Sequence, residues 1–379
     1  MKAGFLFFPT LLLIGNLYLY SWVVRWVQPS YRWRRGILFG MVLLIVLLPV
    51  SRVWGRHDFN LLNQNLTFLS ASWMGISLFL VLGAAGSDLA RLFLRQFGLT
   101  RRVPWSRTFS YRRWAAALIF LGCAGAAGYA FWEAREIGVT RIEVPLRHLP
   151  PDLDGLTVVH LSDVHYGMLH ENGRLSDVVR RVNELRPDLI VFTGDLMDAA
   201  VSHMEEMAVP LSDLKARQGV LAVIGNHEVF AGVKRAEAIM RQAGIQVLRN
   251  EVKTLPGGLQ VLGIDDPAVA RQGLPLPDFD GLVKTLDPGK PSILLYHQPV
   301  HFEEAAGAGV GLQLSGHIHG PQLWPMVPLV RLFYSHMQGL SRNGESYLFV
   351  SRGVGTGGPP MRLGSPPEIV QITLRSSQK

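Results

Sequence analysis

Acids, an amide and histidines stand directly after five of the short apolar runs in the later part of the chain. Side chains of these types bind cations through oxygen or ring nitrogen, and no thiolate is among them. Such a mixed set suits Mn, Fe or Zn better than calcium, which takes oxygen ligands only, or a structural zinc site built on cysteines. In chain order the groups are Asp163 and His165; Asp195 and Asp198; Asn226, His227 and Glu228; His297; and His317 and His319.

The apolar runs that precede these groups have the lengths of strands. They lie at 156–161, 189–193, 219–224, 260–264, 292–296 and 311–314, and their nearly continuous apolarity is typical of strands buried on both faces. Helical spacing over 175–185 predicts a helix that Pro187 ends, and further helices are expected over 201–217, disturbed at Pro210, and over 233–243. This alternation predicts a layered α/β domain. Because sites in open α/β sheets form beyond the carboxyl ends of strands, the five groups are expected to converge.

The ordered pattern Asp-x-His, Gly-Asp, Gly-Asn-His-Glu, a single His and Gly-His-x-His resembles the calcineurin-like metallophosphoesterase superfamily. Segments 316–322, 350–360 and 366–369 are similar to a bacterial branch of membrane-associated or exported enzymes. The resemblance covers about 220 residues. No single block is specific for this superfamily, but the ordered set of five blocks is. It implies a four-layer α-β-β-α sandwich and an enzyme that hydrolyses phosphoesters.

The resemblance also implies two metal ions, each held by its own set of side chains. One metal would be held by Asp163, His165 and His319, and the other by Asn226, His297 and His317. Asp195 would bridge them, since one carboxylate can link metals roughly 3.5–4 Å apart. Two cations lower the pKa of a shared water, so that a bridging hydroxide can form near neutral pH without a protein base.

Two further residues take catalytic roles by the same resemblance. His227 would bond a phosphoryl oxygen and protonate the leaving alkoxide, and Asp198 would orient this histidine. Glu228 is expected to support the metal ligands from behind. Relatives that dephosphorylate proteins have Arg-Gly after the second aspartate, where this chain has Ala199 and Ala200. The loss of a bidentate phosphate clamp argues against a phosphoprotein substrate.

The net charge of +8 averages two different parts of the chain. Residues 1–139 contain 15 Lys and Arg against 4 Asp and Glu, whereas the remainder contains 22 against 25. The basic character therefore belongs to the first third, where arginines flank apolar stretches, and it is no argument for a nucleic-acid partner. The single cysteine, Cys123, excludes an intrachain disulfide.

Four apolar stretches in this first third predict membrane helices, at about 3–24, 36–54, 64–86 and 114–132. The loops after the first and third stretches contain eleven arginines, against five Lys and Arg on the opposite side. The positive-inside rule places these two basic loops in the cytoplasm, and the C-terminal part on the outer face of a bacterial inner membrane. The apolar cores contain no Asp, Glu, Lys or His, which argues for an anchor and against a transporter.

The expected organisation is a transmembrane anchor domain over 1–135, a linker over 136–155 that contains Pro145, Pro150 and Pro151, and a metallophosphoesterase domain over 156–379. Residues 323–333, directly after the last histidines, are apolar and include Trp324 and Phe333. We expect them to pack on the core. The alternative is an exposed apolar lip that contacts lipid or an acyl-bearing substrate.

The sequence thus predicts a membrane-anchored phosphohydrolase with two Mn, Fe or Zn ions, acting on a phosphoester that a lipid or another envelope component could supply. Two alternatives remain. A metal-binding membrane sensor or interaction protein would keep the fold without turnover. A cytosolic-face pyrophosphatase of lipid A precursors would require the opposite topology.

Overall fold

The computed structural model describes residues 2–58, 60–98, 109–167, 169, 172–198 and 202–377. Contacts divide the chain into two units. The helical unit comprises Met1–Gly55, Asn60–Trp132 and Gly358–Met361, and the α/β unit comprises Arg56–Phe59, Glu133–Gly357 and Arg362–Lys379. Ala199 and Ala200, and the arginines of the second basic loop at 101, 102 and 107, lie outside the described residues.

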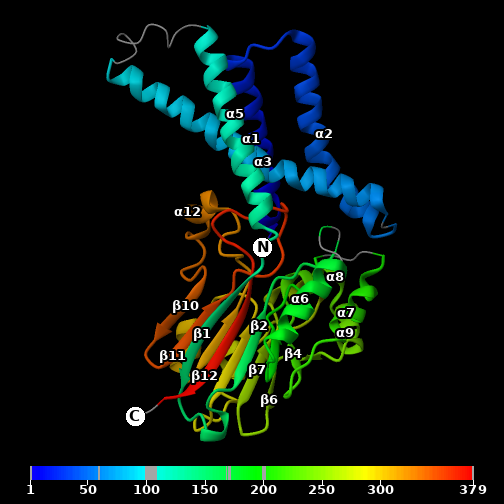
Figure 1. The fold of residues 1–379 in the computed structure, drawn as a ribbon, viewed down its shortest axis with the longest axis vertical. Helices are drawn as coiled ribbons and strands as arrows, with labels where there is room; N and C mark the ends of the chain where they lie inside the picture. Colours follow the sequence, from blue (N-terminus) through cyan, green and yellow to red (C-terminus); the bar gives the residue numbers. More distant parts are fainter. Residues whose placement is uncertain are drawn as a thin grey trace. The chain divides into compact units, whose positions relative to one another are not determined.

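The helical unit contains the long helices α1 (Lys2–Trp26), α2 (Tyr31–Gly55), α3 (Leu61–Gln96) and α5 (Phe109–Glu133) (Figure 1). Trp22, Leu80 and Ala116 are buried where α1, α3 and α5 pack together. Other apolar side chains point outward; Leu118 and Leu121 are 68% and 71% exposed. A unit with apolar side chains both inside and outside is suited to a lipid surrounding.

Three helices are long and apolar enough to cross a membrane among the described residues, namely α2, α3 and the part of α5 at Tyr111–Glu133. The sequence had predicted four crossings, so the count over the described residues is corrected to three. The first predicted stretch forms α1, but its described side chains begin at Thr10. That leaves a stretch shorter than the roughly 20 residues that a crossing needs.

The α/β unit contains two six-stranded mixed sheets. The first has the order β1 (Gly138–Leu146), β12 (Glu368–Ser376), β2 (Thr157–Leu161), β3 (Leu189–Phe192), β4 (Val220–Ala222) and β5 (Gln246–Val247). The second has the order β10 (Gly339–Asn343), β11 (Ser346–Val350), β9 (Leu312–Ser315), β8 (Ser292–Tyr296), β7 (Gln260–Ile264) and β6 (Glu251–Thr254). Pairing is antiparallel at β12–β2, β10–β11 and β6–β7 and parallel elsewhere.

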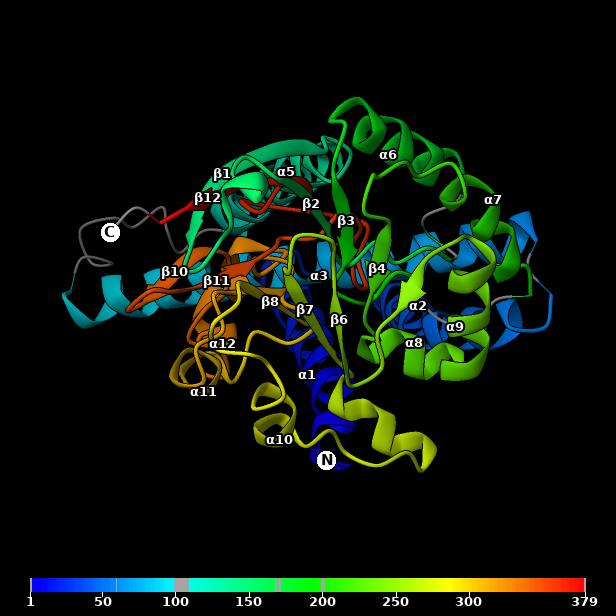
Figure 2. The same ribbon diagram turned by 90° about the horizontal axis from the view of Figure 1, so that it is seen from below.

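Helices cover the outer faces of both sheets (Figure 2). The first sheet packs on α6 (Asn172–Glu184), α7 (Ala208–Leu211) and α9 (Val233–Gln242), and the second on α10 (Phe279–Val283) and α11 (Phe302–Gly307). Between the sheets, side chains such as Val191 and Leu221 share one buried cluster with Ile293 and Leu295. These four layers confirm the predicted α-β-β-α sandwich.

Two local predictions differ from the structure. Residues 138–146 were expected within the linker but form β1, which pairs in parallel with β12 along its whole length. The expected helix over 201–217 is only a short 3-10 turn, Met204–Met207, followed by α7. Pro210 lies inside α7, which ends one residue later at Leu211. A proline does not prevent a first turn, but its missing N–H and its ring oppose a longer helix.

Candidate dinuclear metal centre

The predicted ligands lie beyond the carboxyl ends of strands in both sheets. In the first sheet, Asp163 follows β2, Asp195 follows β3, and Asn226 follows β4 as the first residue of α8 (Asn226–Ala231). In the second sheet, His297 follows β8 and His317 follows β9. The structure therefore brings the predicted groups together where the carboxyl ends of the two sheets meet.

Asp163, His165 and His319 form the first ligand cluster. The Nε2 atoms of His165 and His319 lie 3.0 Å apart. Oδ1 of Asp163 lies 3.4 Å from Nε2 of His319 and 3.9 Å from Nε2 of His165. All three side chains are buried. Lone-pair atoms that converge in a low-dielectric interior are stabilised by a cation among them, so the cluster fits a metal ion.

The second cluster is built around His297 and Asp195. Nε2 of His297 lies 3.2 Å from Oδ2 of Asp195, 3.1 Å from Oδ1 of Asn226 and 3.1 Å from Nδ1 of His317. The same Oδ2 of Asp195 lies 4.0 Å from Nε2 of His165 in the first cluster. This carboxylate is thus placed where one group can serve two cations.

The pKa shifts of two histidines and of Asp195 suit cations, whereas that of His297 does not: burial alone would lower the pKa of His297, but Asp195 outweighs burial and raises this pKa well above its ordinary value. Burial, and next the neighbouring His165, lower the pKa of His319 well below its ordinary value. Burial, and next His297, lower the pKa of His317 to about 4. Both rings are therefore neutral and offer a lone pair. Burial alone would raise the pKa of Asp195, but His297 and His227 outweigh it and hold this pKa well below the usual range.

The backbone at the centre has an unusual conformation. Five of the proposed ligands have a left-handed φ, between 52° and 72°, and they are Asp163, His165, Asp195, His317 and His319. Residues with side chains adopt this region at a cost of the order of 1–3 kcal/mol each, and such positions cluster at functional sites. The surrounding fold must therefore hold these loops firmly.

Glu228 and two glycines allow and stabilise the conformations of the loops that contain the proposed ligands. Glu228 is fully buried, and its carboxylate accepts from the backbone N–H groups of residues 195, 196, 197 and 225 at 2.7–3.2 Å. This agrees with the supporting role expected from the sequence. A Cβ on Gly225 would collide with the Asp195 carboxylate, and one on Gly316 with the Asp163 carboxylate. Only glycine leaves room there for both acids.

His227 lies at the edge of the centre, with its side chain 22% exposed. Its Nδ1 lies 2.5 Å from the carbonyl oxygen and 3.1 Å from Oδ1 of Asp198, so it carries a hydrogen donated to Asp198. Burial alone would lower the pKa of His227, but Asp195 and then Asp198 outweigh it and raise this pKa to about 10. The ring is therefore protonated at neutral pH and can supply a proton.

Arg362 is a supporting residue that the sequence did not suggest. It is fully buried and donates to the carbonyl oxygens of residues 319, 352, 353, 355 and 365. Its Nη2 also lies 3.2 Å from Nδ1 of His319. The guanidinium thus joins the His319 loop to segment 352–365. Arginine at 362 follows no chemical motif, so nothing in the sequence distinguishes it.

Two aromatic residues next to the centre were also missed. The ring of Tyr334 lies 5.7 Å from that of His317, and the ring of Phe230 lies 5.3 Å from that of His227. The guanidinium of Arg271 stacks over Phe230 at 5.2 Å. These side chains add apolar surface and one positive charge to the surroundings of the centre.

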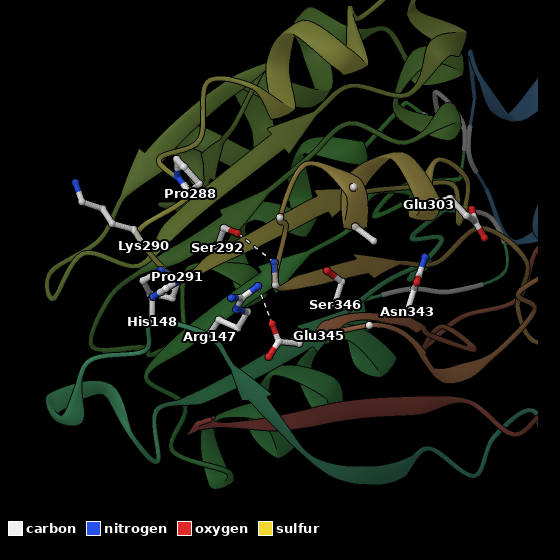
Figure 3. A pocket seen from close by; sticks show the side chains of 15 residues that line it. Arg147, His148, Pro288, Lys290, Pro291, Ser292, Glu303, Asn343, Glu345 and Ser346 are labelled. Atoms are coloured by element: carbon white, nitrogen blue, oxygen red, sulfur yellow. Dashed lines mark hydrogen bonds and ion pairs between the residues drawn. The ribbon is translucent and has the colours of Figure 1, made fainter. Parts of the chain in front are cut away.

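A separate cavity of about 550 Å³ lies at the opposite ends of the strands, where β8 begins at Ser292 (Figure 3). Arg147, Lys290 and Glu345 are among its lining residues. Arg147 forms an ion pair with Glu345 at 2.6 Å, and Lys290 with Asp287 at 3.4 Å. Because acids already neutralise both cations, the cavity lacks the unpaired charge of an anion site.

Comparison with known proteins identifies the family. A profile for calcineurin-like phosphoesterases matches residues 156–321. A "Transmembrane protein with metallophosphoesterase domain" from Danio rerio is 32% identical over 98% of this chain and 89% of its own length. An "Uncharacterized metallophosphoesterase" from Aquifex aeolicus is 34% identical over 65% of this chain and 95% of its own length. A metallophosphoesterase from Bacillus subtilis is 32% identical over 68% and 92% of the two chains.

The chain belongs to the calcineurin-like metallophosphoesterase family, as the sequence motifs predicted. Its class is therefore that of metal-dependent phosphoester hydrolases with a dinuclear centre, and its apolar helices associate it with a membrane. Its relatives come from bacteria and vertebrates alike, so the bacterial branch expected from the sequence is only part of the family's range.

Proposed function

We propose that the chain hydrolyses phosphoesters at a membrane, with its metals held by the residues of the two clusters. Asp163, His165 and His319 would hold one cation, Asn226, His297 and His317 the other, and Asp195 both. Bound there, the cations supply the nucleophile and the positive charge that a phosphoryl group attracts. The observation that supports this allocation best is the convergence of both clusters on Oδ2 of Asp195, at 3.2 and 4.0 Å from ligands of either cluster.

The role proposed for His227 is proton donation. Its Nδ1 is bound to Asp198, so the ring is held with Nε2 turned toward the cluster, 3.9 Å from Oδ2 of Asp195. A protonated imidazole at the exposed edge of the centre can bond a phosphoryl oxygen and then protonate the departing alkoxide. Asp198 stabilises the protonated ring and fixes its orientation.

A lipid-linked or other envelope phosphoester is the substrate class that we propose, with manganese, iron or zinc as the metal and no nucleic acid as partner. A membrane-held enzyme meets phosphoesters at the bilayer surface first. The part of the chain from residue 140 has more acids than bases, 25 against 22, so it offers no general attraction for a nucleic-acid backbone.

We propose further that this part of the chain faces away from the cytoplasm, in a bacterium at the inner membrane. The argument uses only α2, α3 and α5. Arginines precede or begin α2, at 25, 32, 34 and 35, and others follow α3. Two crossings, α2 and α3, keep both basic loops on the cytoplasmic side, and α5 then carries the chain to the other side. The corrected number of spans therefore leaves the proposed orientation unchanged.

Hydrolysis assays on the purified full-length chain in detergent test the function. The substrates are a chromogenic phosphodiester and the matching monoester, with the protein metal-free or supplied with manganese, zinc or iron. We expect metal-dependent turnover that Asp195→Asn abolishes, and a loss of about 10²-fold or more in kcat for His227→Ala. The diester-to-monoester ratio narrows the substrate class.

The non-catalytic metal-binding protein is the second candidate, because the ligands alone would equally serve a sensor. A folded chain that binds two metal ions but turns over neither ester with any of the metals would favour that candidate. Asp195→Asn should then reduce metal binding without any change in an activity that is already zero.

A further inference from the structure

Residues 324–334 form a partly exposed apolar segment, here called the apolar lip. It consists of the 3-10 turn Trp324–Met326, helix α12 (Val327–Val330) and the residues that follow, and α12 is visible in Figure 1. Trp324, Leu332 and Phe333 are 67%, 76% and 69% exposed. The expectation that this stretch packs on the core is therefore wrong for these side chains. Only Leu323, just before the lip, is buried.

The apolar lip is bonded at its start to segment 352–365 and contacts the proposed ligand His317 at its end. At its start, the N–H of Trp324 donates to the carbonyl of Leu363 at 2.7 Å. Gln322, two residues before Trp324, accepts through its side-chain oxygen from the N–H of Gly357 at 2.8 Å, and a Cβ at Gly357 would lie 3.1 Å from Nε2 of His319. At its end, the ring of Tyr334 packs edge-on against His317. The lip is thus a fixed neighbour of the metal centre.

The shape of the apolar lip indicates what can cover it. Side chains that are two thirds or more exposed protrude and cannot by themselves enclose one acyl chain. They can instead enter a fluid apolar phase, where the removal of their apolar surface from water is favourable. Apolar side chains that cluster on a surface facing water mark an interaction surface.

The composition of the lip favours a bilayer over a protein partner. Residues 324–334 contain no acid and one base, Arg331, which is exposed. Tryptophan and tyrosine are enriched where membranes meet water, and an exposed arginine is attracted by anionic lipid headgroups. The same chain has helices that are long and apolar enough to span a membrane.

We propose that the apolar lip inserts Trp324, Leu332 and Phe333 into the interfacial layer of the bilayer and so holds the metal centre at the level of lipid headgroups. The insertion itself does not depend on catalysis. Its consequence for substrate choice rests on the proposed function: phosphoesters of lipid headgroups reach the centre, and soluble esters gain nothing from the lip.

Lipid contact can be measured on the full-length chain in lipid nanodiscs. The only native cysteine is removed by Cys123→Ala, and Leu332→Cys then receives an environment-sensitive fluorophore. The matched control is Leu276→Cys in the same background, because Leu276 is another exposed leucine of the α/β unit, at 62%. Thermal melting and metal content verify that both variants fold.

Lipids that have a spin label high on the acyl chain should quench the fluorophore at 332 at least about twofold, and that at 276 hardly at all. Equal quenching at both positions, or none at 332, would overturn the insertion. The fluorophore at 332 could also show the emission of an apolar environment both in detergent and in nanodiscs, without being quenched by the spin-labelled lipid. That result would show that protein, and not lipid, covers the lip, and it would also overturn the insertion. A second copy or the chain's own helices would then be its occupant.

Activity measurements test the consequence separately. The double variant Trp324→Ser, Phe333→Ser should lose about tenfold in kcat/KM on a phospholipid ester in vesicles. Its activity on a soluble phosphodiester should stay unchanged, and Leu276→Ser should change neither. Equal losses on both substrates would contradict the role in substrate choice. If the unaltered chain hydrolyses neither, the proposed function fails, whereas the quenching result still decides on insertion.

Discussion

Single residues at the metal centre combine ligand chemistry with backbone strain. Asp163, Asp195 and His319 have a left-handed φ in addition to offering a donor atom. Two of these conformations are stabilised by buried side chains outside the clusters: the carboxylate of Glu228 accepts from the N–H of Asp195, and the guanidinium of Arg362 donates to the carbonyl of His319. The strained loops are therefore as much part of the centre as the ligands.

His160 provides a prediction for pH-dependent stability. This ring is fully buried on β2, its Nε2 lies 2.7 Å from Oγ1 of Thr193, and burial lowers its pKa to about 3. In the unfolded chain the pKa returns to its ordinary value of 6.5, so between these values the unfolded state binds the extra proton. Stability is fully present above the unfolded pKa and falls as the pH drops toward 3, by about 2 kcal/mol at pH 5.

The substitution His160→Gln removes the titrating group and keeps a side chain that can bond Thr193. We expect its melting temperature to fall less than that of the unaltered chain when the pH is lowered from 8 to 5. Parallel melting curves for the unaltered chain and His160→Gln would show that His160 is not the proton-linked group.

The sequence predicted which acids and histidines would lie together, because their types are rare after apolar strands and they occur in a recognisable order; their role as metal ligands stays a prediction. It could not reveal Arg362 or Tyr334, whose roles depend on contacts between segments far apart in the chain. Arg362 contacts the carbonyl of His319, 43 residues away. Arginine and tyrosine are also frequent on surfaces, so their types alone predict no site.

At the scale of elements, burial decides which strands could be predicted. Strands β3 and β8 are buried along their whole length, and each is a nearly continuous apolar run. Strand β1 is an edge strand with exposed and half-buried positions, and it contains Arg141, Glu143 and Pro145. Charges and proline are tolerated at an edge, where one side of the strand forms no ladder, and they conceal the strand from sequence patterns.

The loop that Arg362 stabilises provides a prediction at this scale. Arg362→Lys keeps the charge but replaces a five-donor fork with a three-donor ammonium, which cannot satisfy all five carbonyls. We expect a loss of about 3 kcal/mol in the free energy of unfolding and a weaker hold on the cation near His319. The readouts are thermal melting and metal content at limiting manganese.

Arg375→Lys is the matched control for that experiment. Arg375 is exposed and pairs with Glu143 at 2.8 Å on the first sheet. Water and salt screen an exposed ion pair, so it contributes little to stability, and this variant should melt close to the unaltered chain and keep both metals. If Arg362→Lys behaves like Arg375→Lys in melting and in metal content, segment 352–365 does not depend on the guanidinium.

At the scale of the whole molecule, the positive charge is concentrated in the part of the chain that contains the apolar helices. The surplus of 11 positive charges lies in residues 1–139, with 15 bases and 4 acids. The part beyond is nearly neutral, so the high isoelectric point of about 9.8 comes from the part of the chain that contains the apolar helices. The arginines also predict on which side each loop lies, which neither the fold nor the metal centre can indicate.

Cysteine labelling in intact cells tests that orientation. In a Cys123→Ala background, Leu276→Cys reports on the α/β unit, and Trp33→Cys, 70% exposed at the start of α2, reports on the first basic loop. A maleimide that cannot cross membranes should label residue 276 in intact cells, and residue 33 only after permeabilisation. The reverse pattern would place the metal centre in the cytoplasm. In that case α2, α3 and α5 would be inserted in the opposite direction, with both basic loops on the outer face. That topology would favour the alternative function, a cytosolic-face pyrophosphatase of lipid A precursors.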